Sequence, residues 1–120
     1  MVNTSNIEDK ILYIGQPGAT DTDLYTVPTG YKARITQIHA ANTNSATKYF
    51  SLHIVESGDS VADDVCFAKN QELEGTGSVK GGETWDSDIV IPLVAGDKIS
   101  AIQETATAIT LTLIGILEEV

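Results

Sequence analysis

Apolar and polar residues alternate along most of this chain, which is the spacing of a pleated strand rather than that of a helix. In residues 48–55, Phe50, Leu52 and Ile54 share one face. In residues 108–117, aliphatic residues at odd positions alternate with threonine and isoleucine, which suit a pleated surface. Both ranges are therefore predicted to be β-strands, and the second is the most regular in the chain.

Shorter apolar runs between Gly, Pro and Asn turns indicate further strands. These cover residues 11–14, 24–27, 32–42, 65–69, 84–91 and 98–103, with Pro92 and the turn at residues 95–97 separating the last two. About eight strands at spacings of roughly eight to twelve residues are typical of one architecture. We predict an all-β fold, an antiparallel β-sandwich that is jelly-roll-like or immunoglobulin-like.

Two stretches depart from regular alternation. Apolar residues in 32–42 change from odd to even positions near Thr36 and Gln37, which predicts a β-bulge or bend there. Residues 56–82 are less regular, and Ser60 is expected to cap a single helical turn that ends at Asp64.

Length and composition indicate one folded unit. The 120 residues are 42% hydrophobic and 20% charged, which is the range of globular proteins. We predict a single β-sandwich domain over residues 11–120, preceded by a polar N-terminal arm, residues 1–10, which we expect to be mobile. This arm lacks the basic start and apolar run of a secretory signal.

The charge excludes some partners. Seventeen acidic and seven basic residues give a net charge of −10, which repels nucleic acid and anionic membranes. We therefore expect no nucleic-acid and no membrane partner. The lone Cys66 has no second cysteine for an intramolecular disulfide and is expected to be inert.

Residues that carry chemistry are sparse. The chain has no G-x-S-x-G elbow and no phosphate-binding glycine loop. Its two histidines, His39 and His53, would form a metal site with a carboxylate such as Glu104 if their strands were neighbours, but the H-x-H spacing of such barrel enzymes is absent. We predict no catalytic residue, no metal and no cofactor, and hence no enzyme.

Two weaker binding hypotheses remain open. Acidic residues cluster at Asp21 and Asp23, at residues 59–64, and at Asp86 and Asp88, but none has the spacing of a calcium loop. Trp85, with the tyrosines at positions 13, 25, 31 and 49, would form a sugar-stacking platform if these rings were exposed together. The alternative reading of these aromatics is that they belong to the core.

The last predicted strand is apolar on both faces around four residues, Leu113, Ile114, Ile116 and Leu117. A strand with one wet face should not have this pattern. Either residues 56–82 or the N-terminus cover the second face, or another copy of the protein does. These four residues are the candidate self-association face.

Two segments resemble small structural proteins of tailed bacteriophages. Residues 24–43 read LYTVPTGYKARITQIHAANT, similar to an "LYTVPxG" turn that leads into a long strand ending in "xANT". Residues 91–101 read IPLVAGDKISA, similar to the "LxAGDxIxA" strand-turn-strand that follows in such proteins.

This resemblance implies a virion component made in the host bacterial cytoplasm. The expected role is a capsid decoration (cement) protein that assembles as a homo-oligomer, with a trimer favoured, and binds the major capsid protein or another virion protein. A tail, collar or fibre-associated subunit is the alternative of the same class. A carbohydrate-binding module is the alternative of another class.

Overall fold

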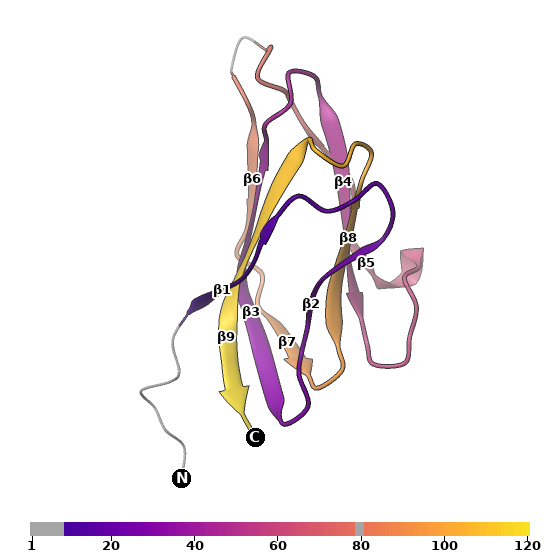
Figure 1. Cartoon of the computed structure of the whole chain (residues 1–120), viewed down its shortest axis with the longest axis vertical. Helices are drawn as coiled ribbons and strands as arrows, with labels where there is room; N and C mark the ends of the chain where they lie inside the picture. Colours follow the sequence, from indigo (N-terminus) through magenta and orange to yellow (C-terminus); the bar gives the residue numbers. More distant parts are fainter. Residues whose placement is uncertain (1–8, 79–80) are drawn as a thin grey trace.

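The computed structural model describes residues 9–78 and 81–120, which form two antiparallel sheets packed face to face (Figure 1). The five-stranded sheet has the order β1-β9-β3-β6, with β7 also paired to β3: β1 (Lys10–Gly15), β9 (Ile109–Glu119), β3 (Tyr31–Asn42), β6 (Thr84–Ser87) and β7 (Ile91–Val94). The four-stranded sheet has the order β2-β8-β4-β5: β2 (Thr22–Thr26), β8 (Lys98–Gln103), β4 (Lys48–Val55) and β5 (Cys66–Leu73). The predicted all-β sandwich is confirmed.

The strand order separates the two predicted architectures. The chain crosses from one sheet to the other between β1 and β2, β2 and β3, and β3 and β4, so early neighbours in sequence do not pair as hairpins. An immunoglobulin-like sandwich would pair its first two strands within one sheet. The fold is therefore jelly-roll-like.

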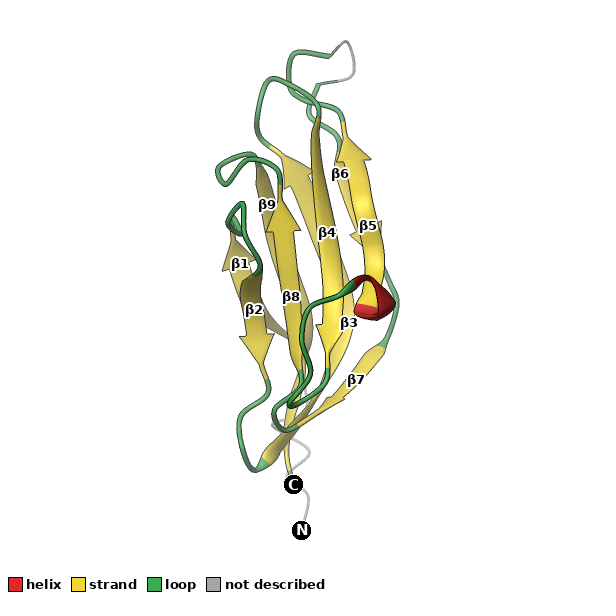
Figure 2. Cartoon of the chain, turned by 90° about the vertical axis from the view of Figure 1, so that its right-hand side faces the viewer, coloured by secondary structure: helices red, strands yellow, loops and turns green. Residues whose placement is uncertain are grey.

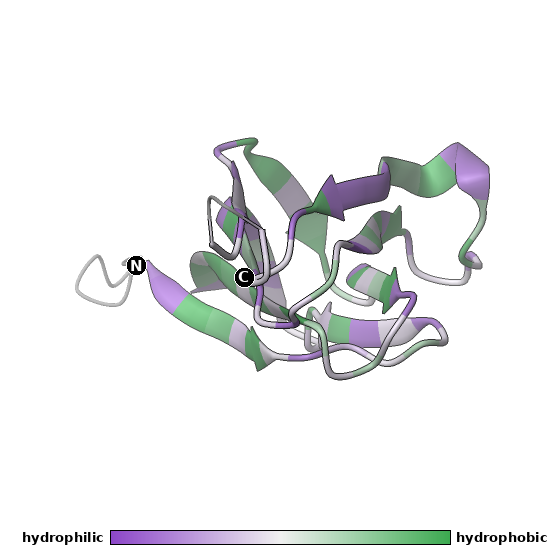
Figure 3. Cartoon of the chain, turned by 90° about the horizontal axis from the view of Figure 1, so that it is seen from above, coloured by the Kyte–Doolittle hydropathy of each residue, from purple (hydrophilic) through white to green (hydrophobic). Residues whose placement is uncertain are grey.

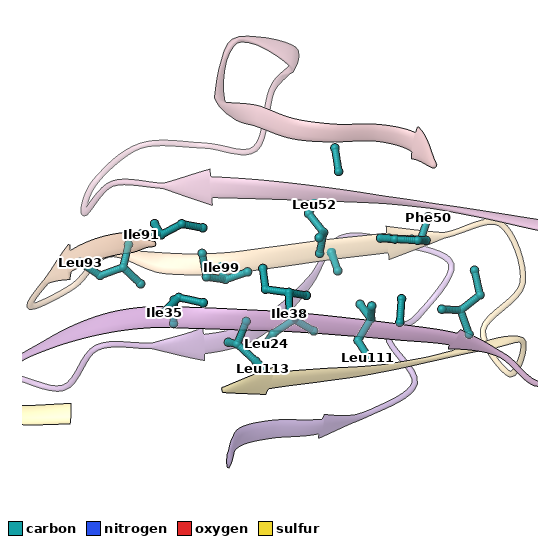
Figure 4. Packing of buried hydrophobic residues seen from close by; sticks show 14 of the residues in the cluster. Leu24, Ile35, Ile38, Phe50, Leu52, Ile91, Leu93, Ile99, Leu111 and Leu113 are labelled. Atoms are coloured by element: carbon teal, nitrogen blue, oxygen red, sulfur yellow. The ribbon is translucent and has the colours of Figure 1, made fainter. Parts of the chain in front are cut away.

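The core lies between the sheets, where the inward positions of both layers meet (Figure 4). Phe50 and Leu52 point into it from β4, and Ile54 packs against it, as their alternation predicts. One buried amide is also satisfied: Gln103 donates to the Pro17 carbonyl at 2.7 Å and accepts from the Ile109 backbone N–H at 2.8 Å. This buried polar side chain is therefore hydrogen-bonded, as a dry interior requires.

The phase change in β3 is a β-bulge. Its register against β9 shifts between Ile35 and Gln37, so Ile35 before the bulge and Ile38 after it both reach the core. The Thr36 hydroxyl, at the bulge, donates to the Ile114 carbonyl at 3.4 Å. The predicted bulge is confirmed, because burial of both isoleucines requires the extra residue.

Three local predictions need correction. Pro92 does not end a strand but lies inside β7, which tolerates it because β7 pairs only with β3 and is a sheet edge. The strand predicted over 84–91 is interrupted between β6 and β7, which leaves Ile89 exposed. The helical turn is the 3-10 turn η2 (Asp63–Val65); its N-cap is Ala62, without a side-chain cap from Ser60.

The ends of the predicted domain are partly described. Residues 1–8 of the predicted arm lie outside the described residues, whereas Lys10 already belongs to β1. Within the described residues, no helix is long and apolar enough to span a membrane.

The two turns of the phage-like segments meet at one end of the sandwich. The Val27 N–H donates to the Asp97 carbonyl, and the Gly96 N–H donates to the Val27 carbonyl, each at 2.9 Å. The Asp97 carboxylate also accepts from the backbone N–H groups of Val94 and Ser57, each at 3.0 Å. Ser57 belongs to the segment after β4, residues 56–65, so Asp97 attaches this segment to the sandwich.

That segment lies over the outer face of the four-stranded sheet, as Figure 2 shows in front of β8 and β4. Three residues on the outer side of these strands, His53, Val55 and Ser100, are consequently buried. Part of the outer face of the four-stranded sheet is therefore covered by the chain itself.

Candidate functional site

The four residues of the candidate self-association face do not lie on one face of β9. Leu113 is 0% exposed and belongs to the core, and Leu117 packs against that core. Ile114 and Ile116 alternate with them and lie on the outer side of the five-stranded sheet, half-buried. The structure thus assigns two of the four residues to the sandwich interior and leaves two for contact with another molecule.

Neighbouring strands extend the surface around Ile114 and Ile116. Ile11 of β1 is the register partner of Ile114 and is 62% exposed. On the other side, Ile116 is opposite Arg34, which in turn is opposite Pro92. We name the surface formed across these strands the outer apolar face; it comprises Ile11, Ile14, Pro92, Val94, Ile114 and Ile116.

A groove of about 410 Å³ occupies one part of this face. It is lined by Lys32, Ala33, Arg34, Pro92, Leu93, Val94, Ile116 and Glu118. Lys32 and Glu118 form an ion pair at 3.7 Å across it. Arg34, the only arginine of the chain, is exposed and makes no ion pair with any residue in 9–78 or 81–120. The groove therefore offers a guanidinium beside apolar walls.

The described part of residues 56–82 does not cover this surface, contrary to one of the two possibilities considered from the sequence. Their first part lies on the opposite sheet, and β5 is an edge strand of that sheet. Of the described N-terminal residues, those of β1 pair beside β9 and extend the same sheet, and the Asp9 carboxylate accepts a hydrogen bond from the Thr36 hydroxyl at 3.1 Å. Figure 3 shows the hydrophobic run of β1 at the edge of the sandwich.

Exposed apolar residues are concentrated on the five-stranded side. The large hydrophobic residues exposed among the described ones are Ile11, Ile14, Tyr49, Ile89, Val90, Val94 and Val120. All except Tyr49 belong to the strands of the five-stranded sheet, to the β6–β7 connection or to the residue after β9. Exposed apolar residues gathered on one side of a sandwich mark a contact site rather than the scatter found on ordinary surfaces.

The two histidines are not neighbours. His39 lies on β3 in the five-stranded sheet and His53 on β4 in the other sheet, so the hypothetical metal site with Glu104 does not form. His39 Nδ1 contacts the Asp86 carboxylate at 2.5 Å, and Glu104 accepts from the Tyr49 N–H at 3.1 Å. The hypothesis was wrong because it required β3 and β4 to pair.

His53 is buried without a partner for its Nδ1 among the described residues. Its register partners are Cys66 on β5 and Ser100 on β8. The half-buried Cys66 thiol donates to the Ala68 carbonyl at 3.3 Å. Burial of this histidine follows from the covering segment after β4.

Several acidic residues are engaged in pairs. Lys98 contacts Asp23 at 3.1 Å, and Lys69 contacts Asp63 at 2.8 Å. The hydrogen bond from Lys69, together with its positive charge, lowers the pKa of Asp63. Across the described part of the chain, no three His, Cys, Asp or Glu side chains are grouped so that they could hold a metal ion.

The aromatic residues do not form an exposed platform. Trp85 packs edge-on against Phe50 in the sandwich, with ring centroids 5.3 Å apart. The tyrosines at 13, 25 and 31 also pack against the core, and burial raises the pKa of Tyr13 and of Tyr25. Of the proposed sugar-stacking residues, Tyr49 alone is exposed. The platform hypothesis is therefore wrong, and the core interpretation holds for Trp85 and for the tyrosines at 13, 25 and 31.

Sequence reasoning missed much of the outer apolar face. Arg34 carried a usable signal, because it is the only arginine and alternates with the buried Ala33 and Ile35. Val94 was missed because Pro92 suggested a turn rather than an edge strand.

No family model and no curated protein matches the chain. Among solved structures, it is similar to a pentameric capsid protein isolated from metagenomic phage sequences, with 17% identity, a TM-score of 0.41, and coverage of 99% of this chain. The chain spans only 64% of that capsid protein. It is also similar to the Eiger TNF of S. frugiperda, with 15% identity, a TM-score of 0.41, and coverage of 99% of this chain and 88% of the other. Similarities of this size carry no information on function.

Proposed function

We propose that this protein is a non-enzymatic structural subunit of a tailed-phage virion, a decoration (cement) protein that self-associates and binds the assembled head. The observation that carries the proposal is the outer apolar face, whose residues Ile11, Ile14 and Val94 stay exposed, whereas a chain segment lies over part of the other sheet. The two outer faces of one sandwich are thus treated differently by the same chain. A partner molecule accounts for the uncovered one.

The two phage-like segments support the same proposal. Their turns are far apart in sequence, yet they are hydrogen-bonded to each other through Val27, Gly96 and Asp97. The resemblance therefore covers one continuous piece of the structure rather than two unrelated turns. It is compatible with a shared architecture at that end of the sandwich.

Cement proteins act by mass action. A ligand that binds the assembled shell and not its separated subunits stabilises the shell by about 2.7 kcal/mol per site at a hundredfold excess over Kd. Repeated over a capsid, this opposes the pressure of the packaged genome. No bond is made or broken, so the role requires surface and no catalytic group.

The test is the composition of purified virions. In gradient-purified particles of the phage whose genome carries this gene, quantitative mass spectrometry should find the protein in a fixed, simple ratio to the major capsid protein. Particles assembled without it should release their DNA at a lower temperature. A copy number that instead matches the tail or collar would reassign it to that position. Its absence from particles would refute a virion role of either kind.

A further inference from the structure

The side of the five-stranded sheet that carries the outer apolar face is wide enough to contact another folded domain. The chain measures 53 × 31 × 19 Å, and the sheets are stacked along the intermediate extent, so a sheet face spans the longest and shortest ones (Figure 1). The side of the molecule that carries the outer apolar face therefore has an outline of about 1,000 Å², against roughly 800 Å² that a stable interface takes from each partner. An isolated peptide strand in the groove would cover a small part of this face, whereas another sandwich would cover most of it.

The groove is a local exception to the charge of the molecule. The net charge is −10, yet the groove carries Lys32 and Arg34 on adjacent outward positions of β3, with Glu118 paired to Lys32. The Arg34 guanidinium is left to pair with a carboxylate from outside the described residues. Its occupant should therefore present an acidic group next to aliphatic side chains.

The chain itself presents such a segment beside the groove. Between β6 and β7, Asp88 is exposed and is followed by Ile89 and Val90, which are 49% and 55% exposed. Asp88 forms no ion pair with any residue of the described ranges. This acidic and aliphatic connection matches the basic and aliphatic groove in charge and in polarity.

We propose that the outer apolar face is the contact between copies of this chain, in which Arg34 of one copy pairs with Asp88 of the neighbouring copy. This inference rests on the self-association included in the proposed function and names its surface. Because two chains of strong negative charge repel each other, the single guanidinium sets where one copy can approach the next. The aliphatic residues around the pair then supply the apolar burial that holds the copies together.

A charge swap tests this pairing on the full chain, with the mass measured by sedimentation equilibrium over a range of concentrations. Arg34→Asp and Asp88→Arg should each weaken association about tenfold or more, and the double variant should recover most of that loss. Asp21→Arg is the matched control, because it reverses an exposed acid that precedes β2 of the other sheet, and it should leave the mass unchanged. Near-ultraviolet circular dichroism checks that each variant is folded.

Val94→Lys gives an independent readout, because this 63% exposed side chain can be charged without entering the core. It should also release monomers. Single variants that associate like the wild type, or a double variant without recovery, would overturn the pairing. A wild-type chain that is monomeric at every concentration would also overturn the inference. If Arg34→Asp then lost binding to virions, the capsid shell would be the partner of the outer apolar face. Failure of the contact between copies would leave the proposed virion role standing, because that role is tested separately by the protein composition of purified particles.

Discussion

Replacing Asp97 by alanine tests how the chain covers one of its own sheets. Asp97 is 8% exposed, and its two carboxylate oxygens accept from two backbone N–H groups, those of Ser57 and Val94, at 3.0 Å each. One bond closes the turn before β8, and the other attaches the segment that lies over β4 and β8. Alanine removes both acceptors and leaves both donors without a partner.

The expected loss follows from these two bonds. A hydrogen bond to a charged group contributes about 1.5–3 kcal/mol, and the lower end applies because the site is near the surface, so the sum is about 3 kcal/mol. For 120 residues the unfolding entropy is about 250 cal/mol/K, which converts this loss to a fall of about 12 °C in Tm. Asp97→Asn should fall by about half as much, because its amide keeps one oxygen as acceptor.

The assay is thermal and urea unfolding of both variants beside Asp21→Ala, an exposed aspartate that should change Tm by less than about 2 °C. Hydrogen exchange supplies the local readout: the Ser57 amide should exchange faster in Asp97→Ala under native conditions. If Asp97→Ala unfolds like the control, or if the Ser57 amide stays protected, the carboxylate does not attach the covering segment.

Three further outcomes are expected. Gly115→Ala should lower the free energy of unfolding by about 1–3 kcal/mol in urea, because its Cβ would lie 2.6 Å from the Arg34 carbonyl oxygen; wild-type stability would contradict this packing. His53→Leu should leave stability unchanged or raise it, because it removes a buried nitrogen without a partner, and a loss above about 1 kcal/mol in urea would argue that the ring is bonded. In an NMR titration Asp63 should protonate below its ordinary pKa, so that the ion pair is lost as pH falls through that lowered value; Lys69→Met should return the midpoint to the ordinary value, and an unchanged midpoint would refute the pairing.

The strands were predictable from the sequence because their signal is local. Alternation placed residues 48–55 and 98–103 at the bounds that the structure has, and the change of phase near Thr36 located the bulge. In each case the side chains two positions apart report which face is buried, whatever strand lies beside them. Pro92 misled this reading, because proline excludes a central strand but is tolerated on an edge, and the pattern does not say which strands are edges.

The candidate self-association face was only partly predictable from the sequence. The apolar character of residues 113–117 was visible in the sequence, yet the strand places Leu113 in the core and Ile114 outside it. Alternation alone would have separated these two residues. It would not have shown which strands lie beside Ile116, and hence that Arg34 and Pro92 share its surface.

By itself the sequence determined the β class, most strand positions, the acidic surface and the scarcity of chemical groups, since these depend on composition and on contacts between near neighbours. Only the tertiary structure decided the jelly-roll order, the separation of His39 from His53, the packing of Trp85 against Phe50 and the sheet on which residues 56–65 lie. These depend on pairings between residues far apart in the chain, and the free energy that selects them comes from burying whole faces against each other. The uncovered face of the five-stranded sheet is a result of that selection.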